Sequence, residues 1–87
     1  MEIKTFQSTY DLAEFHCYIT KTDDGDCINV VELLLNTDNT EDISYIEKDF
    51  SHIFVVESHH HSYVFSGYEV TEYYITDSGL IKVICVK

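Results

Sequence analysis

Three consecutive runs of strand-forming residues after position 52 constrain this chain more than any other feature. The first run, residues 53–56, is Ile-Phe-Val-Val, which suits a largely buried strand because β-branched and aromatic side chains pack well on a pleated surface. A polar break of hairpin-loop length, residues 58–62, leads into a longer run, residues 63–76. Gly67 inside that run indicates a bulge or a bend. The pattern predicts consecutive antiparallel strands.

The second and third runs are joined by the clearest turn in the chain, Asp77, Ser78 and Gly79. Glycine can take the left-handed backbone conformation that closes a three-residue hairpin loop. Before this turn the alternation changes phase at Glu72, which fits either a strand that bends or a misread register. The third run, residues 80–86, is mostly apolar on both faces, so we expect a central or covered strand there.

The first half of the chain adds companion strands and one helix. We expect strands over residues 3–9, 15–20 and 27–35, with a short break at 11–14 and a hairpin loop at 21–26. A helix is expected over about residues 40–52, because Ile43, Ile46 and Phe50 recur at helical spacing. Asp38 with Glu41 resembles a capping box, and Asp42 adds favourable charge at the helix start.

These elements predict an α+β fold in a single domain, residues 1–87. The expected architecture is a mainly antiparallel five- to six-stranded sheet with one helix packed on a face, in the order β-β-β-α-β-β-β. The chain has no proline, only three glycines and no long apolar run, so we expect neither an internal linker nor a membrane span. We therefore expect a soluble protein of the cytoplasm.

The charge of the chain is strongly unbalanced. Sixteen acidic residues stand against five lysines, and the formal net charge is −11. Between positions 22 and 81 the only basic residue besides histidine is Lys48. Direct binding to nucleic acid or to an anionic membrane is therefore not expected, because both need a basic surface. A basic surface of another protein is the natural complement, although excess charge also simply keeps small proteins in solution.

Residues that could carry chemistry lack the spacing that chemistry needs. His59 and His61 could share a metal ion with His52 or His16, but a solvated loop explains the histidine tract more simply, and we assign no metal site. The acidic turn at residues 23–26 lacks the spacing of a calcium loop. The odd set of cysteines, Cys17, Cys27 and Cys85, fits reduced thiols. We find no nucleophile with a paired base and no phosphate-binding loop, so we expect no enzyme and no cofactor.

Tyrosines crowd the run of residues 63–76, at positions 63, 68, 73 and 74. Tyrosine is favoured in sheets and also in protein interfaces, so packing and binding both explain this cluster. If the run is a binding face, Glu69 and Glu72 are interleaved with the rings. The residues expected to contact a partner are acids of three segments with one tyrosine: Asp23, Asp24, Asp26, Asp38, Glu41, Asp42, Glu69, Glu72, Tyr73 and Asp77.

The second half of the chain resembles a group of small phage proteins. The sequences Ile-Ser-Tyr-Ile-Glu-Lys-Asp-Phe, Ile-Phe-Val-Val-Glu and Tyr-Val-Phe-Ser-Gly-Tyr-Glu-Val-Thr-Glu-Tyr-Tyr-Ile are followed by Gly-Leu-Ile-Lys-Val-Ile-Cys-Val. Together these segments, within residues 41–87, are similar to proteins of phages and prophages of Gram-positive bacteria. Some of those proteins are encoded near tail or baseplate genes. The resemblance brings no catalytic residues with it.

In size and charge the chain also resembles anti-CRISPR proteins. That likeness implies an inhibitor whose carboxylates occupy the basic groove of an RNA-guided nuclease in place of nucleic acid. A rigid set of carboxylates competes for lysines and arginines that neutralise phosphates. Our leading hypothesis is therefore a phage-encoded acidic inhibitor of a host defence nuclease. One alternative is a structural or accessory protein of the phage tail region, which would self-associate or dock through sheet edges and tyrosines. Another is a metal-binding module built on the histidine tract. We expect the chain to be a monomer or a small homo-oligomer.

Overall fold

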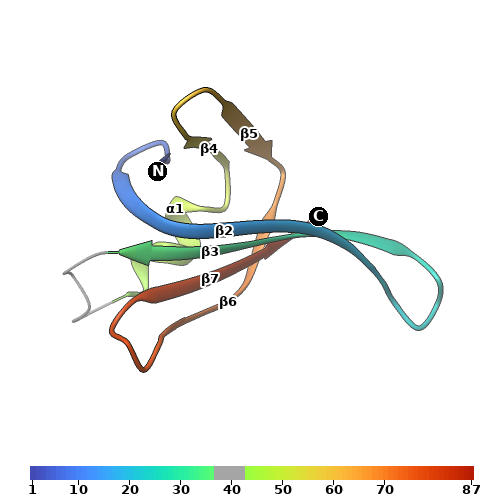
Figure 1. Ribbon diagram of the computed structural model, residues 1–87. Coiled ribbons are helices and arrows are strands. Elements are labelled where there is room, and N and C mark those ends of the chain that lie inside the picture. The colour runs from blue at the N-terminus through green and yellow to red at the C-terminus, as the bar shows by residue number, and fades with distance from the viewer. Residues whose placement is uncertain (37–42) are drawn as a thin grey trace.

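The computed structural model describes residues 1–36 and 43–87, and in them seven strands form one antiparallel sheet (Figure 1). In chain order the elements are β1 (Glu2–Lys4), β2 (Thr9–Lys21), β3 (Cys27–Asn36), α1 (Tyr45–Asp49), β4 (Ile53–Glu57), β5 (Ser62–Ser66), β6 (Glu69–Ile75) and β7 (Ile81–Val86). Across the sheet their order is β5-β4-β1-β2-β3-β7-β6. The expected sheet-dominated class is confirmed, but the expected number of five to six strands and the element order β-β-β-α-β-β-β are wrong.

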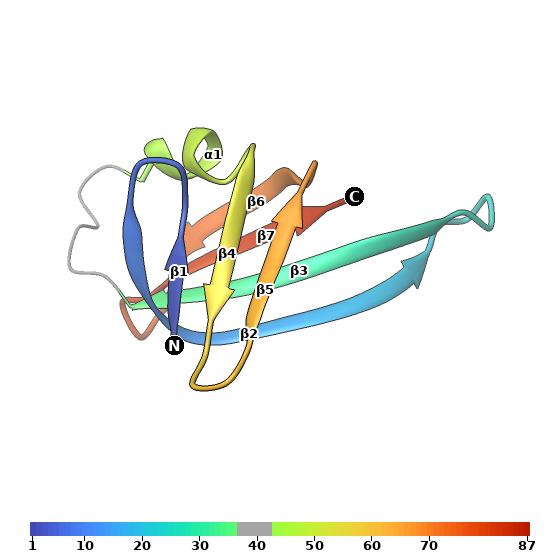
Figure 2. The same ribbon diagram turned by 90° about the horizontal axis from the view of Figure 1, so that it is seen from above.

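The additional strand arises at Gly67. This glycine has a φ of +75°, a conformation that other residues adopt only under strain, and it divides the run of residues 63–76 into β5 and β6. Those two strands stand at opposite ends of the sheet, although only Gly67 and Tyr68 separate them in the chain. The sheet must therefore curl until its ends approach each other. Figure 2 shows the result, with β4 and β5 crossing over β2 and β3.

Aromatic rings fill the corner where the curled sheet turns back on itself. The ring centroids of Phe54 and Phe65 lie 5.2 Å apart, and those of Phe65 and Tyr68 lie 5.6 Å apart. Such pairs contribute roughly 0.5–1.5 kcal/mol beyond the burial of their surface. The three rings therefore hold the start of β6 against the β4–β5 hairpin.

The core lies between the two crossing layers and is built from alternate residues of the strands. Successive side chains of a strand point to opposite faces, so Val31, Leu33 and Leu35 share the face that lies inside the curl. In register they meet Cys85, Val83 and Ile81 of β7. The buried cluster comprises Ile3, Leu12, Val31, Leu33, Leu35, Ile46, Phe50, Phe54, Val56, Ile81, Val83 and Cys85. Each large apolar side chain buried in this way contributes about 1.5–3 kcal/mol.

The first strands differ from expectation in their limits. The strand expected over residues 3–9 ends early, because the backbone N–H of Thr5 donates to the carbonyl of Ser8 at 2.8 Å and closes a tight turn. The break expected at residues 11–14 lies within β2, where a register shift between Leu12 and Glu14 marks a bulge. The long β2 pairs with β3 in a hairpin that extends beyond the rest of the sheet (Figure 1). We call residues 19–29 of this hairpin the arm.

The later strands agree more closely with the sequence pattern. The change of phase at Glu72 corresponds to a register shift between Val70 and Glu72. The expected turn is present, since the N–H of Thr76 donates to the carbonyl of Leu80 at 2.8 Å and Gly79 has a φ of +85°. β7 is an interior strand, with β3 on one side and β6 on the other, as its two apolar faces indicate.

The helix is much shorter than the expected residues 40–52. Ile46 and Phe50 are buried in the core, as the helical spacing predicts. The helix ends at Asp49, with Phe50 as its C-cap, and the hydroxyl group of Ser51 donates to the carbonyl of Lys48 at 2.8 Å. α1 lies at one end of the curled sheet and not across one of its faces (Figure 2). The capping box expected from Asp38 and Glu41 lies outside the described residues.

Among the described residues, no helix has the length and apolar character that crossing a membrane requires.

Candidate protein-interaction face

The acids expected to bind a partner are distributed over separate parts of the fold. Asp23, Asp24 and Asp26 lie at the tip of the arm, and Asp77 lies in the turn between β6 and β7. The two views in Figures 1 and 2 place these turns at opposite ends of a molecule 39 Å long. Glu69 and Glu72 lie on β6, the edge strand of the sheet. The remaining predicted acids, Asp38, Glu41 and Asp42, lie outside the described residues.

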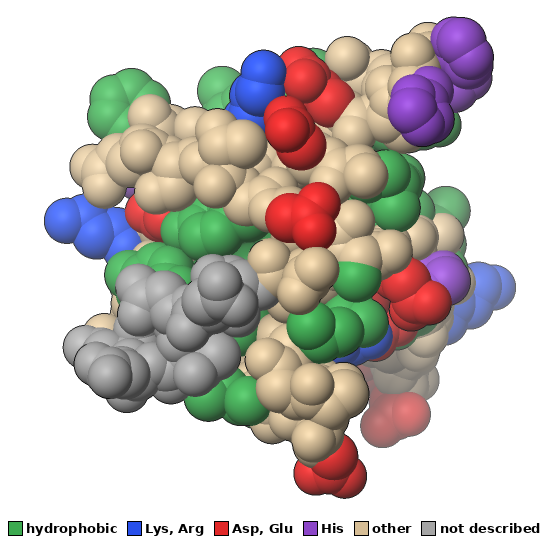
Figure 3. Space-filling view, turned by 60° about the vertical axis from the view of Figure 1, so that its left-hand side comes forward, with side chains coloured by type: hydrophobic (Ala, Val, Ile, Leu, Met, Phe, Trp, Pro, Cys, Tyr) green, Lys and Arg blue, Asp and Glu red, His purple; other side chains and the backbone are tan. Residues whose placement is uncertain are grey.

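Figure 3 shows how acids are spaced on the side of the molecule that faces left in Figure 1. Acidic side chains stand singly or in small groups there, separated by uncharged and apolar groups. A partner surface would therefore contact only some of the acids at once. A single binding surface would therefore lie on one face of the sheet.

The strands β2, β3, β7 and β6 present such a face on the side opposite the core, which we call the outer face. Because Val31 and Leu33 point inward, Val30 and Glu32 point to this outer face. The register then places Tyr18, Val30, Val86 and Glu69 in one row across the four strands. The apolar side chains of the outer face are Tyr18, Ile28, Val30, Leu34, Tyr74, Ile84 and Val86.

Four carboxylates lie on the outer face. Glu14 and Glu32 lie over β2 and β3, whereas Glu69 and Glu72 lie along β6. The only lysine of the outer face within the described residues is Lys82, whose Nζ lies 3.3 Å from a carboxylate oxygen of Glu32. The outer face is therefore negative overall, and its charged and apolar side chains are interspersed: Glu32 lies between Val30 and Leu34 on the interior strand β3. Interspersed carboxylates and apolar groups can contact a basic protein surface.

Glu32 is the best-fixed carboxylate of the outer face. A hydrogen bond from the hydroxyl group of Tyr18 lowers the pKa of Glu32, and the ammonium group of Lys82 lowers it further against the opposing effect of desolvation. The same hydrogen bond raises the pKa of Tyr18. Tyr18, Glu32 and Lys82 thus link three adjacent strands, and they hold a negative charge in a defined position at neutral pH.

The exposed tyrosines of the outer face do not include Tyr73, which was expected to contact a partner. Tyr73 is only partly exposed and packs against the buried cluster, on the side of β6 that faces the core. Tyr18 and Tyr74 are instead the exposed rings, with 46% and 43% of their surface accessible. Tyr18 was missing from the expected site. Its signal was present in the sequence, because it alternates with Cys17 and Ile19 in a strand pattern.

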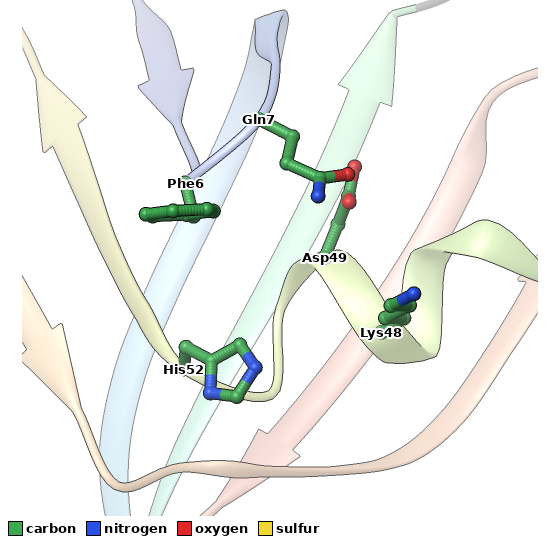
Figure 4. Close-up of a pocket in the computed structure, with 5 residues that line it drawn as sticks. All are labelled: Phe6, Gln7, Lys48, Asp49 and His52. Atoms are coloured by element: carbon green, nitrogen blue, oxygen red, sulfur yellow. The ribbon is translucent and has the colours of Figure 1, made fainter.

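A small hollow lies between the β1–β2 loop and the end of α1 (Figure 4). It is lined by Phe6, Gln7, Lys48, Asp49 and His52, and its volume is about 130 Å³. Pockets that bind small molecules usually measure about 300–1,000 Å³. The carboxylate of Asp49 is already engaged, since it accepts a hydrogen bond from the hydroxyl group of Tyr10. The hollow therefore carries no functional assignment.

The histidine tract forms the tip of the β4–β5 hairpin. The backbone N–H of Ser58 donates to the carbonyl of His61 at 2.9 Å, and His59 and His60 occupy the turn between them. Within residues 1–36 and 43–87, no three side chains of histidine, cysteine, aspartate or glutamate are arranged to hold a metal ion. The alternative of a metal-binding module gains no support from this part of the chain.

The three cysteines occupy different environments. Cys17 and Cys27 are exposed on β2 and β3, and Cys85 is buried in the core. Burial raises the pKa of the Cys85 thiol to about 12 and also raises that of Cys17. Both thiols are therefore protonated at neutral pH, a state in which cysteine is a weak nucleophile.

Comparison with known proteins adds no relative to this description. No protein family, curated protein or solved structure matched the chain.

Proposed function

We propose that this protein is a phage-encoded inhibitor that binds the basic, nucleic-acid-binding groove of a host defence nuclease. The observation that carries the proposal is the outer face, where Glu14, Glu32, Glu69 and Glu72 stand among apolar side chains, against one lysine within the described residues, Lys82. Such a groove presents lysines and arginines that neutralise phosphates, and carboxylates compete for them. This role takes place in the cytoplasm of the bacterial host and needs neither a catalytic residue nor a cofactor.

The arm extends the proposed contact surface. Its tip carries Asp23, Asp24 and Asp26, and the hairpin is held by backbone hydrogen bonds from Thr22 to Asp26 and from Gly25 to Thr22, at 2.9 and 3.0 Å. A hairpin of this kind enters a groove with little loss of conformational freedom. The outer face would then lie against the rim of the groove while the arm reaches into it. This division of roles accounts for the wide separation of the acids.

The test is inhibition of guide-loaded RNA-guided nucleases from Gram-positive bacteria. We expect the protein to block DNA cleavage by a sensitive member of such a panel. Its affinity should fall steeply between about 50 and 500 mM salt, because the contact is electrostatic. Double-stranded target DNA should compete with the protein for the nuclease. Inhibition that is insensitive to salt, or no binding across the panel, would contradict the proposal.

A second candidate is an accessory protein of the phage tail region that acts through apolar protein contacts. It is favoured by a patch on the outside of β1, β4 and β5, where Phe6, Ile53 and Val64 are exposed. Phe6 has 85% of its surface accessible, an unusual exposure for phenylalanine. Binding to purified tail or baseplate proteins that persists at high salt would favour this candidate over the inhibitor.

A further inference from the structure

The two edges of the sheet are protected very differently. An exposed edge strand offers unpaired backbone groups to any other chain, and proteins usually blunt such an edge with charges, proline or a bulge. β6 has two of these devices, since Glu69 and Glu72 lie on it and a register shift lies between Val70 and Glu72. β5 has none of them. Its sequence is Ser-Tyr-Val-Phe-Ser, and it pairs with β4 without a register shift.

The backbone groups that β5 leaves open can be assigned from the hairpin. Antiparallel partners alternate between pairs that exchange hydrogen bonds and pairs that do not. The hydrogen bond from Ser58 to His61 fixes the phase, so that Tyr63 and Phe65 are bonded to β4. The intervening residues, Ser62, Val64 and Ser66, therefore direct their N–H and C=O groups away from β4. They face the open edge, because β5 is the last strand in the sheet.

The sequence of β5 is nearly symmetric about its central residue, which makes the edge complementary to itself. We propose that β5 pairs antiparallel with β5 of a second copy of this chain, around a two-fold axis at Val64. In this register Val64 faces Val64 of the second copy, and Ser62 faces its Ser66. All three residues with open backbone groups then form hydrogen-bonded pairs. Tyr63 stands opposite Phe65 of the second copy, so the neighbouring aromatic positions also match.

Charge explains why a second copy can meet this edge. Two molecules with a formal charge of −11 each repel, and they can approach most closely where the surface carries no net charge. β5 contains no ionisable group other than Tyr63. On the outside of β1 and β4, Lys4 and Glu57 form an ion pair at 3.2 Å, and Glu2 lies beside Glu57 in register. The repulsion between copies is therefore smaller at β5 than at the other edge strand, β6, which carries Glu69 and Glu72.

The exposed side chains of the edge also match across the axis. Val64 has 68% of its surface accessible, and it pairs with Val55 of β4. In the proposed dimer one apolar strip crosses four strands. It consists of Val55 and Val64 of one copy, followed by Val64 and Val55 of the second copy. Cross-strand contacts between β-branched side chains stabilise sheets. The proposal does not depend on the nuclease partner, because it concerns the opposite end of the sheet from β6.

Light scattering on the full chain tests the dimer. We expect the unmodified protein to have the mass of a dimer at about 100 µM, a concentration suited to a small interface. Val64→Lys places two ammonium groups opposite each other and should raise the dissociation constant by about 100-fold. Ile75→Lys, on the other edge strand, should leave the dimer intact. A monomer at that concentration, or a dimer that survives Val64→Lys, would overturn the proposal.

Disulfide formation tests the register and does not require a charged substitution. In a background of Cys17→Ser and Cys27→Ser, Val64→Cys should give a covalent dimer on mild oxidation. Hydrogen-bonded antiparallel pairs have Cα atoms about 5.5 Å apart, within disulfide range. Ser66→Cys is the matched control, because two copies of that residue would lie roughly 13 Å apart along the strands. Equal cross-linking of the two variants, or none with Val64→Cys, would overturn the proposed pairing.

Discussion

The hydroxyl group of Tyr10 on β2 donates a hydrogen bond to the carboxylate of Asp49 at the end of α1. The ring of Tyr10 also stacks on Phe50, with centroids 5.7 Å apart. This contact fastens the helix to a strand that lies 39 positions earlier in the chain. Burial raises the pKa of Tyr10 well above its ordinary value, and the hydrogen bond to Asp49 raises it further.

Removing this hydroxyl should destabilise the protein. We expect Tyr10→Phe to lower the free energy of unfolding by about 1–2 kcal/mol at pH 7, because a partly buried carboxylate loses its donor. The raised pKa of Tyr10 stabilises the fold fully below the unfolded tyrosine value, near 10. That stabilisation is lost as the pH rises through the higher folded value. The variant should therefore lose less stability than the unmodified protein between pH 9 and pH 11.

Urea unfolding at several pH values measures both effects. Tyr74→Phe is a suitable control, since Tyr74 is exposed on β6. Equal losses of stability in the two variants at pH 7 would show that the Tyr10–Asp49 contact is unimportant for the fold.

The buried end of the helix should contribute more stability than any single polar contact. Phe50 is completely buried, and its ring lies 5.4 Å from that of Phe54. Phe50→Ala should lower the free energy of unfolding by about 3–5 kcal/mol, because it removes a large side chain and leaves a cavity. Phe6→Ala makes the same chemical change at an exposed position and should alter stability by less than about 0.5 kcal/mol. Thermal unfolding of both variants would reveal the contrast.

The connection between the two ends of the sheet depends on Gly67. A Cβ atom at this position would meet only the side chain of Lys87, at 3.6 Å, so there is room for it. The φ of +75° is nevertheless unfavourable for alanine, and Gly67→Ala should cost about 1–2 kcal/mol. Gly25→Ala at the tip of the arm should cost less, because that turn can rearrange without disturbing the core. Equal costs in urea unfolding would contradict this account.

The tyrosine on the outer face should set the acidity of its neighbour. The pKa of Glu32 is lowered first by the hydrogen bond from Tyr18, so Tyr18→Phe should raise it toward the ordinary glutamate value. The lowered pKa stabilises the fold above the unfolded value, and this stabilisation is lost as the pH falls through the folded value. NMR titration of the Glu32 side chain measures the shift directly. An unchanged titration curve in Tyr18→Phe would show that the Tyr18 hydroxyl does not lower the pKa of Glu32.

The carboxylates of β6 offer a test of the proposed binding face. If the inhibitor binds through that face, replacing both Glu69 and Glu72 by glutamine should weaken nuclease binding about tenfold at low salt and flatten its salt dependence. The control is Glu2→Gln with Glu47→Gln, which removes the same charge from β1 and from α1. Equal weakening by both pairs would indicate a general effect of net charge.

Alternation in the sequence was sufficient to predict most strands but not their neighbours. The pattern in β3 and β7 reports which side chains are buried, because it reflects each strand's own two faces. It contains no information about which strands pair. The pairing of Ile3 with Val56, between β1 and β4, joins residues more than fifty positions apart and could not be derived from local sequence. The curl of the sheet follows from such pairings.

Local breaks in the pattern were harder to interpret than the strands themselves. Gly67 indicates a bend in the chain. A bend within one strand and a connection from one edge strand of the sheet to the other give the same sequence pattern, and the structure has the second. The helix was expected to be longer because the apolar spacing continues from Ile43 to Phe50. For the candidate site, the charges of Glu69 and Glu72 could be recognised in advance. Their position beside Val86 and Ile84 requires the register of β6 against β7.

The order of strands in the sheet has a consequence for how the chain folds. β7 enters between β3 and β6, and β1 can acquire its second neighbour only when β4 arrives. Both events close long loops before any compensating contact forms, a situation that slows the search for the native state. We expect refolding in milliseconds to seconds, much slower than for a helical protein of this length. During that interval the unprotected edge of β5 would be open to other chains, so refolding yield should decline as protein concentration increases.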